Sequence, residues 1–290
     1  MNARSMLANL DLRAVQQVVK WTVYTILIVN FVFYVIDDME AAEHSLRAGG
    51  SFLAWTAMFT TTIDELAWFA LLFLFELETY ALSDEAFEGA TGPVIHAVRI
   101  VCYLFLAHTI YAYAGIGLTL QQALPLAGIT DLCQLANQGI SYIDNLAYTV
   151  VNQSNCSGLS AGTVFFPVDS ASVVTDAEGM RLSRQLAWLD LVEASVWLLI
   201  VFLIEFMVRL QNRGISSGPM IAMGNVAKPA LYGMLLLVAA FWGFKQHWLY
   251  VWDELIWIGG FLAIEMNVVE WREELRDEAP QHDGQPPSRS

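Results

Sequence analysis

The sequence contains few charged residues, and this shortage restricts what the protein can be. Charged side chains make up 15% of its 290 residues, whereas 56% are hydrophobic and the mean hydropathy is +0.48. A soluble domain of this length carries more charge and fewer long apolar runs. The net charge of −15 argues against nucleic acid as a partner and against a polybasic surface that binds anionic lipids.

Motifs of catalysis and of several transport classes are also missing from the sequence. It has no glycine-rich phosphate loop, no Ser/His/Asp set and no zinc-ligand spacing. It also lacks the Pro-x-Asp/Glu-x-x-Lys/Arg motif of mitochondrial carriers, the arginine ladder of voltage sensors, a potassium-filter sequence and a rhodopsin-like lysine. His96 and His108 share one apolar run but are about 120° apart around a helix, which is poor geometry for two metal ligands. We therefore expect no enzyme, no metal and no cofactor.

Long apolar runs are what the sequence has in abundance. Six of them reach about 20 residues, which is enough to cross a bilayer. They lie at residues 17–37, 62–82, 95–119, 186–208, 229–246 and 250–270. The N-terminus is polar for too long to be a cleavable signal peptide, so we expect the first run to be retained. The predicted fold class is an all-α membrane protein with six transmembrane helices in the lipid bilayer.

The six runs form three pairs that carry the same marks. In each pair the first helix begins with a base and has a tyrosine four positions later, and the second has a tryptophan and a glutamate eight positions later. The residues are Lys20, Tyr24, Trp68 and Glu76; Arg99, Tyr103, Trp197 and Glu205; and Lys228, Tyr232, Trp257 and Glu265. A further aromatic residue, Tyr34, Tyr113 or Trp242, follows each base by fourteen positions. This recurrence predicts three pseudo-repeated two-helix hairpins, at residues 17–82, 95–208 and 229–270.

The base and the glutamate of each hairpin are expected to lie at similar depth, because the base begins one helix and the glutamate lies near the end of its antiparallel neighbour. Ionisable groups inside a bilayer are costly and usually functional. One interpretation is a channel or transporter in which these carboxylates carry a cation or a proton. The other is a non-catalytic scaffold or accessory subunit of a larger membrane complex, in which the ion pairs lock the bundle together. The sequence leaves both open, and it leaves open a homo-oligomer or a membrane partner protein.

Lysine and arginine predict the orientation. Ten of them lie on the side that holds both termini and four on the opposite side. Since positive residues concentrate in cytoplasmic segments, we expect a multi-pass protein of a bacterial inner membrane with cytoplasmic N and C termini. Many acids, including Asp38, Asp64 and Asp190, fall on the extracytoplasmic side. They are interpreted either as a vestibule that concentrates cations or as a solvated acidic rim.

Residues 121–183 form one long loop, which is expected to be a small extracytoplasmic cap. We predict in it an amphipathic helix at 130–147, a short strand at 163–166 that Pro167 ends, and a disulfide between Cys133 and Cys156.

The remaining segments outside the six runs are shorter. Residues 1–16 are expected to be an amphipathic surface segment, and residues 51–60 an interfacial helix. The next helix is predicted to begin at a capping box over 62–65. Residues 211–227 are expected to form a loop, and residues 271–290 a disordered cytoplasmic tail.

Overall fold

The computed structural model describes residues 3–47, 49–78, 91–168, 172–215 and 217–262. These residues are mostly helical (75%) and also contain a small sheet. The chain divides into two compact units, and each is described by itself. One unit comprises residues 1–27 and 239–290, and the other comprises residues 28–238.

Five long helices account for most of the described residues. They are α1 (Ala3–Ser45), α3 (Thr60–Glu76), α5 (Thr91–Gln122), α7 (Ala177–Asn212) and α8 (Pro219–Phe244), and residues 248–262 are also helical. Helix α1 runs without a break through the predicted boundary at residue 16. Helix α8 begins at Pro219, so the predicted loop at 211–227 is wrong over its second half. Proline suits the first position of a helix, which needs no backbone donor. Pro229 is accommodated inside α8.

Four of these helices are long and apolar enough to cross a membrane, counted over the described ranges. They contain Gln17–Ser45, Thr91–Gln122, Ala177–Gln211 and Pro219–Phe244. A bent pair, α2 (Phe52–Met58) with α3, gives a fifth if the two count as one broken span. The last predicted span, 250–270, falls partly outside the described residues. The chain therefore has the helices of a membrane protein, while six spans and the threefold repeat stay predictions.

The start of α3 differs from the predicted capping box. Ser51 is the N-cap of α2, and its hydroxyl accepts from the Ala54 N–H. Helix α2 is bent by 71° from α3. Helix α3 then begins at Thr60 without a side-chain cap. The backbone N–H and the hydroxyl of Thr62 instead donate to Asp38 Oδ2 of α1, at 2.9 and 2.7 Å. A carboxylate from another helix thus satisfies a donor of the first turn, which explains why the local box is not used.

The loop at 121–183 contains a four-stranded sheet, and the helix predicted at 130–147 is wrong. A short 3-10 helix, η2 (Leu132–Leu135), is followed by β1 (Ser141–Asp144), β2 (Ala147–Val150), β3 (Phe165–Val168) and β4 (Val173–Asp176). Asn137 and Gly139 have positive φ angles and end helical geometry. Asn145 and Leu146, at φ 47° and 67°, form the tight turn between β1 and β2.

The strand order is β2-β1-β4-β3, with a parallel pair between β1 and β4 and antiparallel pairs elsewhere. The predicted strand at 163–166 appears as β3, two residues later. Pro167 lies inside β3 instead of ending it, paired with Val174. An edge strand tolerates proline because one row of its backbone donors needs no partner.

The sheet has its own core, and we call residues 121–176 the cap. Cys133 and Cys156, at the start of the short helix α6 (Cys156–Leu159), form the predicted disulfide, with their Cα atoms 4.8 Å apart. The bond lies in a buried apolar cluster that includes Tyr142, Phe165 and Val174. A core this small needs such a cross-link to hold a fixed structure.

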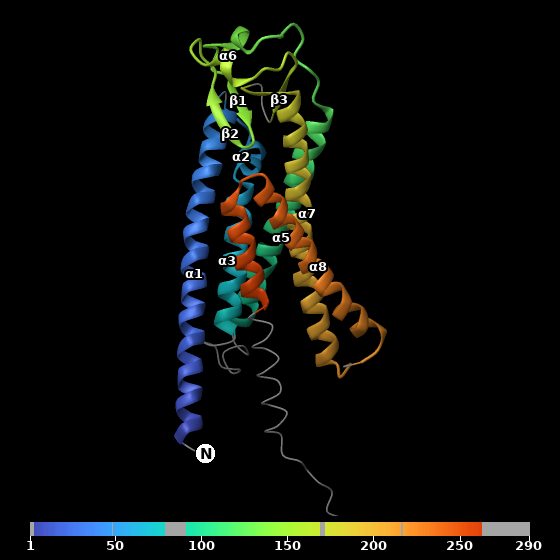
Figure 1. Ribbon diagram of the computed structural model, residues 1–290. Coiled ribbons are helices and arrows are strands. Elements are labelled where there is room, and N and C mark those ends of the chain that lie inside the picture. Colours follow the sequence, from blue (N-terminus) through green and yellow to red (C-terminus); the bar gives the residue numbers. More distant parts are fainter. Residues whose placement is uncertain (1–2, 48, 79–90, 169–171, 216, 263–290) are drawn as a thin grey trace, which may run out of the picture. The chain divides into compact units, whose positions relative to one another are not determined.

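Two connections join the cap to the helices of its own unit, and a hydrogen bond between α7 and α5 lies beside them. Leu120 of α5, Val173 of β4 and Met180 of α7 share one buried cluster. Arg184 Nε of α7 donates to the Leu120 carbonyl at 2.9 Å, and His44 Nδ1 of α1 lies 2.7 Å from Ser141 Oγ of β1. Figure 1 shows the strands gathered at one end of α5 and α7, which we call the cap end.

Asp176 fixes the junction between β4 and α7. Its carboxylate accepts from the N–H of Gly179 at 2.9 Å and from the hydroxyls of Tyr142 and Ser160 at 3.0 and 2.5 Å. Partial burial acts to raise the pKa of Asp176, but these hydrogen bonds outweigh it and the pKa lies below its ordinary value. Burial, together with the hydrogen bond to Asp176, raises the pKa of Tyr142 to about 12.

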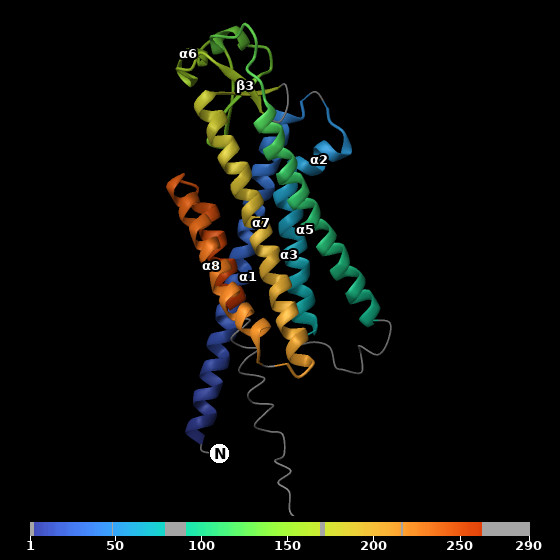
Figure 2. The same cartoon turned by 90° about the vertical axis from the view of Figure 1, so that its right-hand side faces the viewer.

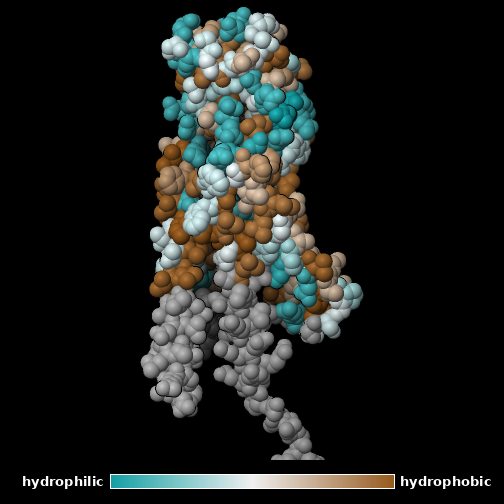
Figure 3. Space-filling view, viewed as in Figure 1, coloured by the Kyte–Doolittle hydropathy of each residue, from teal (hydrophilic) through white to brown (hydrophobic). Residues whose placement is uncertain are grey.

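Helices α3, α5 and α7 lie side by side in both ribbon views (Figures 1 and 2). Their outward faces are apolar, with Leu66, Leu104 and Leu199 each more than half exposed. Figure 3 shows brown, hydrophobic side chains along the helices and more hydrophilic ones toward the cap. Exposed apolar side chains in such number on long helices are what a lipid environment requires.

Candidate functional site

Polar side chains from four helices meet in the part of residues 28–238 that is nearer the cap. We call them the acidic layer: Asp38 of α1, Thr61, Thr62, Asp64 and Trp68 of α3, Thr109 and Tyr113 of α5, and Asp190 of α7. All lie within apolar helices, and none of the three aspartates is fully exposed. The layer therefore places three carboxyl groups in a largely apolar surrounding.

Contacts between neighbouring helices define the acidic layer. Asp38 accepts from Thr62, as described above, and Thr61 Oγ1 lies 3.4 Å from the hydroxyl of Tyr113. Within α3, Trp68 Nε1 donates to Asp64 Oδ2 at 3.1 Å, because positions four apart share a helix face.

The fully buried Thr109 approaches Asp64 from α5. Tyr113 lies close enough to interact electrostatically with Asp38, Asp64 and Asp190. The hydroxyls of α5 thereby bring the carboxylates of α1, α3 and α7 into one group.

In the acidic layer, Asp38 and Asp64 accept hydrogen bonds from neutral donors, and Asp190 lies near Tyr113. The described residues contain no lysine or arginine in an ion pair with Asp38, Asp64 or Asp190. The charged neighbours that act on them are themselves acids: Asp37 on Asp38, and Glu193 on Asp190. A carboxylate without a countercharge in an apolar place is costly, so such a group favours taking up a cation.

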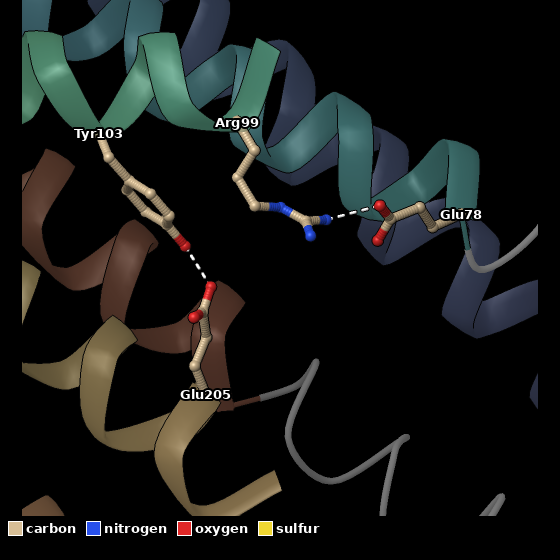
Figure 4. Close-up of polar contacts among 4 residues, drawn as sticks. All are labelled: Glu78, Arg99, Tyr103 and Glu205. Atoms are coloured by element: carbon tan, nitrogen blue, oxygen red, sulfur yellow. Dashed lines mark hydrogen bonds and ion pairs between the residues drawn. The ribbon is translucent and has the colours of Figure 1, made fainter. Parts of the chain in front are cut away.

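A second polar group lies farther from the cap, and we call it the arginine layer. Figure 4 shows Arg99 and Tyr103 of α5 pointing to carboxylates on two different helices. Arg99 Nη2 lies 2.6 Å from Glu78 Oε1, just beyond α3, and the Tyr103 hydroxyl donates to Glu205 of α7. Glu205 also accepts from Arg209 Nη2 at 3.0 Å, one turn along α7. Here each carboxylate has a cation beside it.

An apolar section separates the two layers. On α7, Asp190 and Glu205 are 15 positions apart, about 22 Å along a helix. Between them lie Trp197, whose ring meets that of Trp68 edge-on at 6.1 Å, and the fully buried Ile200. Leu106 of α5, 2% exposed, lies between Tyr103 and Tyr113 on its own helix. A charge passing from one layer to the other would have to cross this section.

The structure places only some of the predicted site residues together. Arg99 forms its ion pair with Glu78, two positions after the predicted Glu76. Tyr103, on the same helix as Arg99, donates to Glu205. Lys20 lies over the ring of Tyr24, 5.7 Å from its centroid, in the other unit. Lys228 and Tyr232 lie on α8 in the unit of residues 28–238, and Glu76 ends α3. Glu265 lies outside the described residues.

The sequence pattern missed the acidic layer as a site, although the signal was present. Asp64 and Asp190 each interrupt an apolar helix, which a solvated rim does not require. The sequence assigns them to a cation-concentrating vestibule or a solvated rim, because each lies near the predicted end of a span. In the other unit Asp253 and Glu254, in the corresponding part of the predicted third hairpin, are also buried, at 6% and 3% exposed.

The donor set of the acidic layer suits protons and small cations better than a coordinated transition metal. Among the described residues no group of three or more His, Cys, Asp or Glu side chains is arranged to hold a metal ion. Hydroxyl groups and aspartates can exchange a proton at short range. Comparison of the chain with protein-family models, curated proteins and solved structures found no match.

Proposed function

We propose that the protein is a membrane channel or transporter that moves protons, or another small cation, and that the acidic layer is its binding site. The observation that carries this proposal is the absence of a cationic partner for Asp38, Asp64 and Asp190 among the described residues. Three uncompensated carboxylates in apolar helices lower the stability of the fold, so a structural role alone accounts poorly for them.

The arginine layer has a different role in this proposal. Its carboxylates are already neutralised by Arg99 and Arg209, so a passing cation would have to displace a bound guanidinium. The sequence pattern pointed to Glu76, Glu205 and Glu265 as transport residues. The contacts favour transport at the acidic layer and a locking function for Glu205, which joins α7 to α5 through Tyr103.

The apolar section supplies the barrier that such a protein needs. A hydrophobic constriction excludes water and stops ions until it widens. Trp68 belongs to both the acidic layer and the apolar section, because its indole N–H donates to Asp64 and its ring packs against Trp197. Loss of the charge on Asp64 weakens the Trp68 contact, which links cation binding to the packing of the barrier.

Flux measurements in proteoliposomes test the proposal. The purified full chain is reconstituted with a pH-sensitive dye inside, a potassium gradient and valinomycin set the potential, and proton entry is followed. Asp64→Asn keeps the shape of the side chain and removes its charge. The matched control is Asp144→Asn, which makes the same change at an exposed position in the cap.

We expect proton flux from the wild type and from Asp144→Asn, and flux at the level of empty vesicles from Asp64→Asn. Undiminished flux in Asp64→Asn would remove the acidic layer from the pathway. A wild type that passes neither protons nor sodium or potassium would contradict the proposal. It would favour the other interpretation, in which the protein is a scaffold or an accessory subunit.

A further inference from the structure

A groove lies between the cap end of α1 and helix α2, apart from both polar layers. Its volume is about 610 Å³. Its lining is mainly apolar, with three charged residues: Ile36, Met39, Ala42, Leu46, Trp55 and Phe59 with Glu40, Glu43 and Arg47. The rings of Trp55 and Phe59 stack with centroids 5.8 Å apart and form one wall, while α1 forms the other.

The surroundings of the groove are those of a membrane interface. Ile36 and Met39 are 51% and 58% exposed on α1, and α2 exposes Phe52 and Leu53 to 80% and 64%. The charged residues of the groove follow Ile36 and Met39 toward the cap, on a stretch of α1 that already carries Asp37 and Asp38. Apolar surface that leads into a charged rim matches a phospholipid, whose acyl chains end in a polar headgroup.

The charges of the rim specify the headgroup. Glu40 and Glu43 are three positions apart on one face of α1, and Arg47, two residues beyond the end of α1, lines the same groove. Arg47 is fixed, because its Nε donates to the Glu43 carbonyl at 3.2 Å and Nη1 donates to the Gly139 carbonyl at 2.9 Å. Two carboxylates and one guanidinium complement a headgroup that carries both an ammonium and a phosphate, and they disfavour one with phosphate alone.

We propose that this groove binds a phospholipid with an ammonium headgroup, of the phosphatidylethanolamine class. An acyl chain lies against Trp55 and Phe59, the phosphate meets Arg47, and the ammonium lies between Glu40 and Glu43. The proposal rests on the groove and its charges and is independent of any transport through the helices.

Quenching of Trp55 fluorescence by brominated lipids tests this binding. The full chain is reconstituted in vesicles of equal parts phosphatidylethanolamine and phosphatidylglycerol, and either one or the other lipid carries brominated acyl chains. The contribution of Trp55 is the difference between the wild type and Trp55→Phe. We expect brominated phosphatidylethanolamine to quench Trp55 roughly threefold more than brominated phosphatidylglycerol, as partly exposed charge pairs allow.

Variants of the rim separate charge recognition from ordinary lipid contact. Glu40→Gln with Glu43→Gln should bring the ratio of the two quenching values to about one. Asp37→Asn removes a carboxylate from the same stretch of α1 but outside the lining, and it should keep the wild-type ratio. Equal quenching by both lipids in the wild type, or an unchanged ratio in the double variant, would overturn the proposal. Absence of quenching by either lipid would also overturn it, because another protein surface would then cover the groove.

Discussion

The acidic layer and the arginine layer both contain carboxyl side chains, and they share α5 and α7. The carboxyl groups of the two layers have different partners. Asp64 and Asp190 face hydroxyls, an indole and other acids. Glu78 and Glu205 face Arg99, Arg209 and Tyr103. A carboxylate beside a guanidinium is a fixed charge pair, whereas one beside neutral donors can take up and release a cation. The partner therefore decides whether a membrane carboxylate locks helices together or binds a mobile ion.

The largest effect on proton flux is expected when one carboxyl group from each layer is replaced on the same helix, α7. Asp190→Asn and Glu205→Gln each remove one negative charge from α7. We expect Asp190→Asn to reduce proton flux to the level of empty vesicles, because its carboxylate belongs to the binding site. Glu205→Gln should keep most of the flux and lower stability instead. Flux assays and thermal unfolding on the same preparations measure both, and the reverse pattern would exchange the roles of the layers.

The next effect concerns the locking pair. Arg99→Gln leaves Glu78 without its cation, and because both side chains are about three-quarters buried we expect a loss of about 2 kcal/mol in unfolding free energy. The double variant Arg99→Gln/Glu78→Gln should recover most of that loss. Arg209→Gln is the control, since a side chain that is 74% exposed contributes less than about 1 kcal/mol. Equal losses from the two arginine variants would contradict this account of the pair.

A smaller effect is expected in the apolar section between the layers. Ile200→Thr places a hydroxyl at a fully buried position and should raise proton leak severalfold, because the section then admits water more easily. Ile200→Val keeps the section apolar and controls for the loss of volume. If the threonine and valine variants show equal proton leak, the barrier depends on tight packing and not on the exclusion of water.

The smallest effect lies in the cap, at the N-terminus of α7. Asp176→Asn removes a carboxylate whose pKa is lowered on folding, so its contribution to stability is present above the unfolded value near 3.8. That contribution is lost as the pH falls through the still lower folded pKa. We expect the variant to be less stable than the wild type by up to about 1 kcal/mol at pH 7, with the difference shrinking toward pH 3. Denaturant midpoints of the full chain at both pH values measure it, and a difference independent of pH would contradict the charge argument.

Much of the helical framework and one cross-link could be predicted from the sequence. Long apolar runs fix the existence of α5 and α7, because only a helix satisfies the backbone over such a length in lipid. The disulfide between Cys133 and Cys156 was predictable because two cysteines share the single long loop. The sheet around it was not, because the loop has no clear period and its register depends on contacts between β1 and β4, which are distant in sequence.

The candidate site was predicted only in part, for a similar reason. Tyr103 and Glu205 belong to the repeated pattern and do meet, but Arg99 pairs with Glu78, which the pattern did not include. The spacing along one helix fixes which face a residue occupies, not which neighbouring helix comes beside it. Asp38 and Thr62 show this most plainly, since their contact joins α1 to α3 in place of the capping box that the local sequence predicts.

Infrared difference spectroscopy of carboxyl groups tests the central claim most directly. The full chain in vesicles is titrated between acidic and neutral pH, and the carbonyl stretch of protonated carboxyl groups is recorded. The proteins compared are the wild type, Asp64→Asn, Asp190→Asn and Glu205→Gln. The account predicts a wild-type signal that is reduced in both aspartate variants and unchanged in Glu205→Gln. A signal that disappears in Glu205→Gln and persists in both aspartate variants would contradict it, and would assign the mobile cation to the arginine layer.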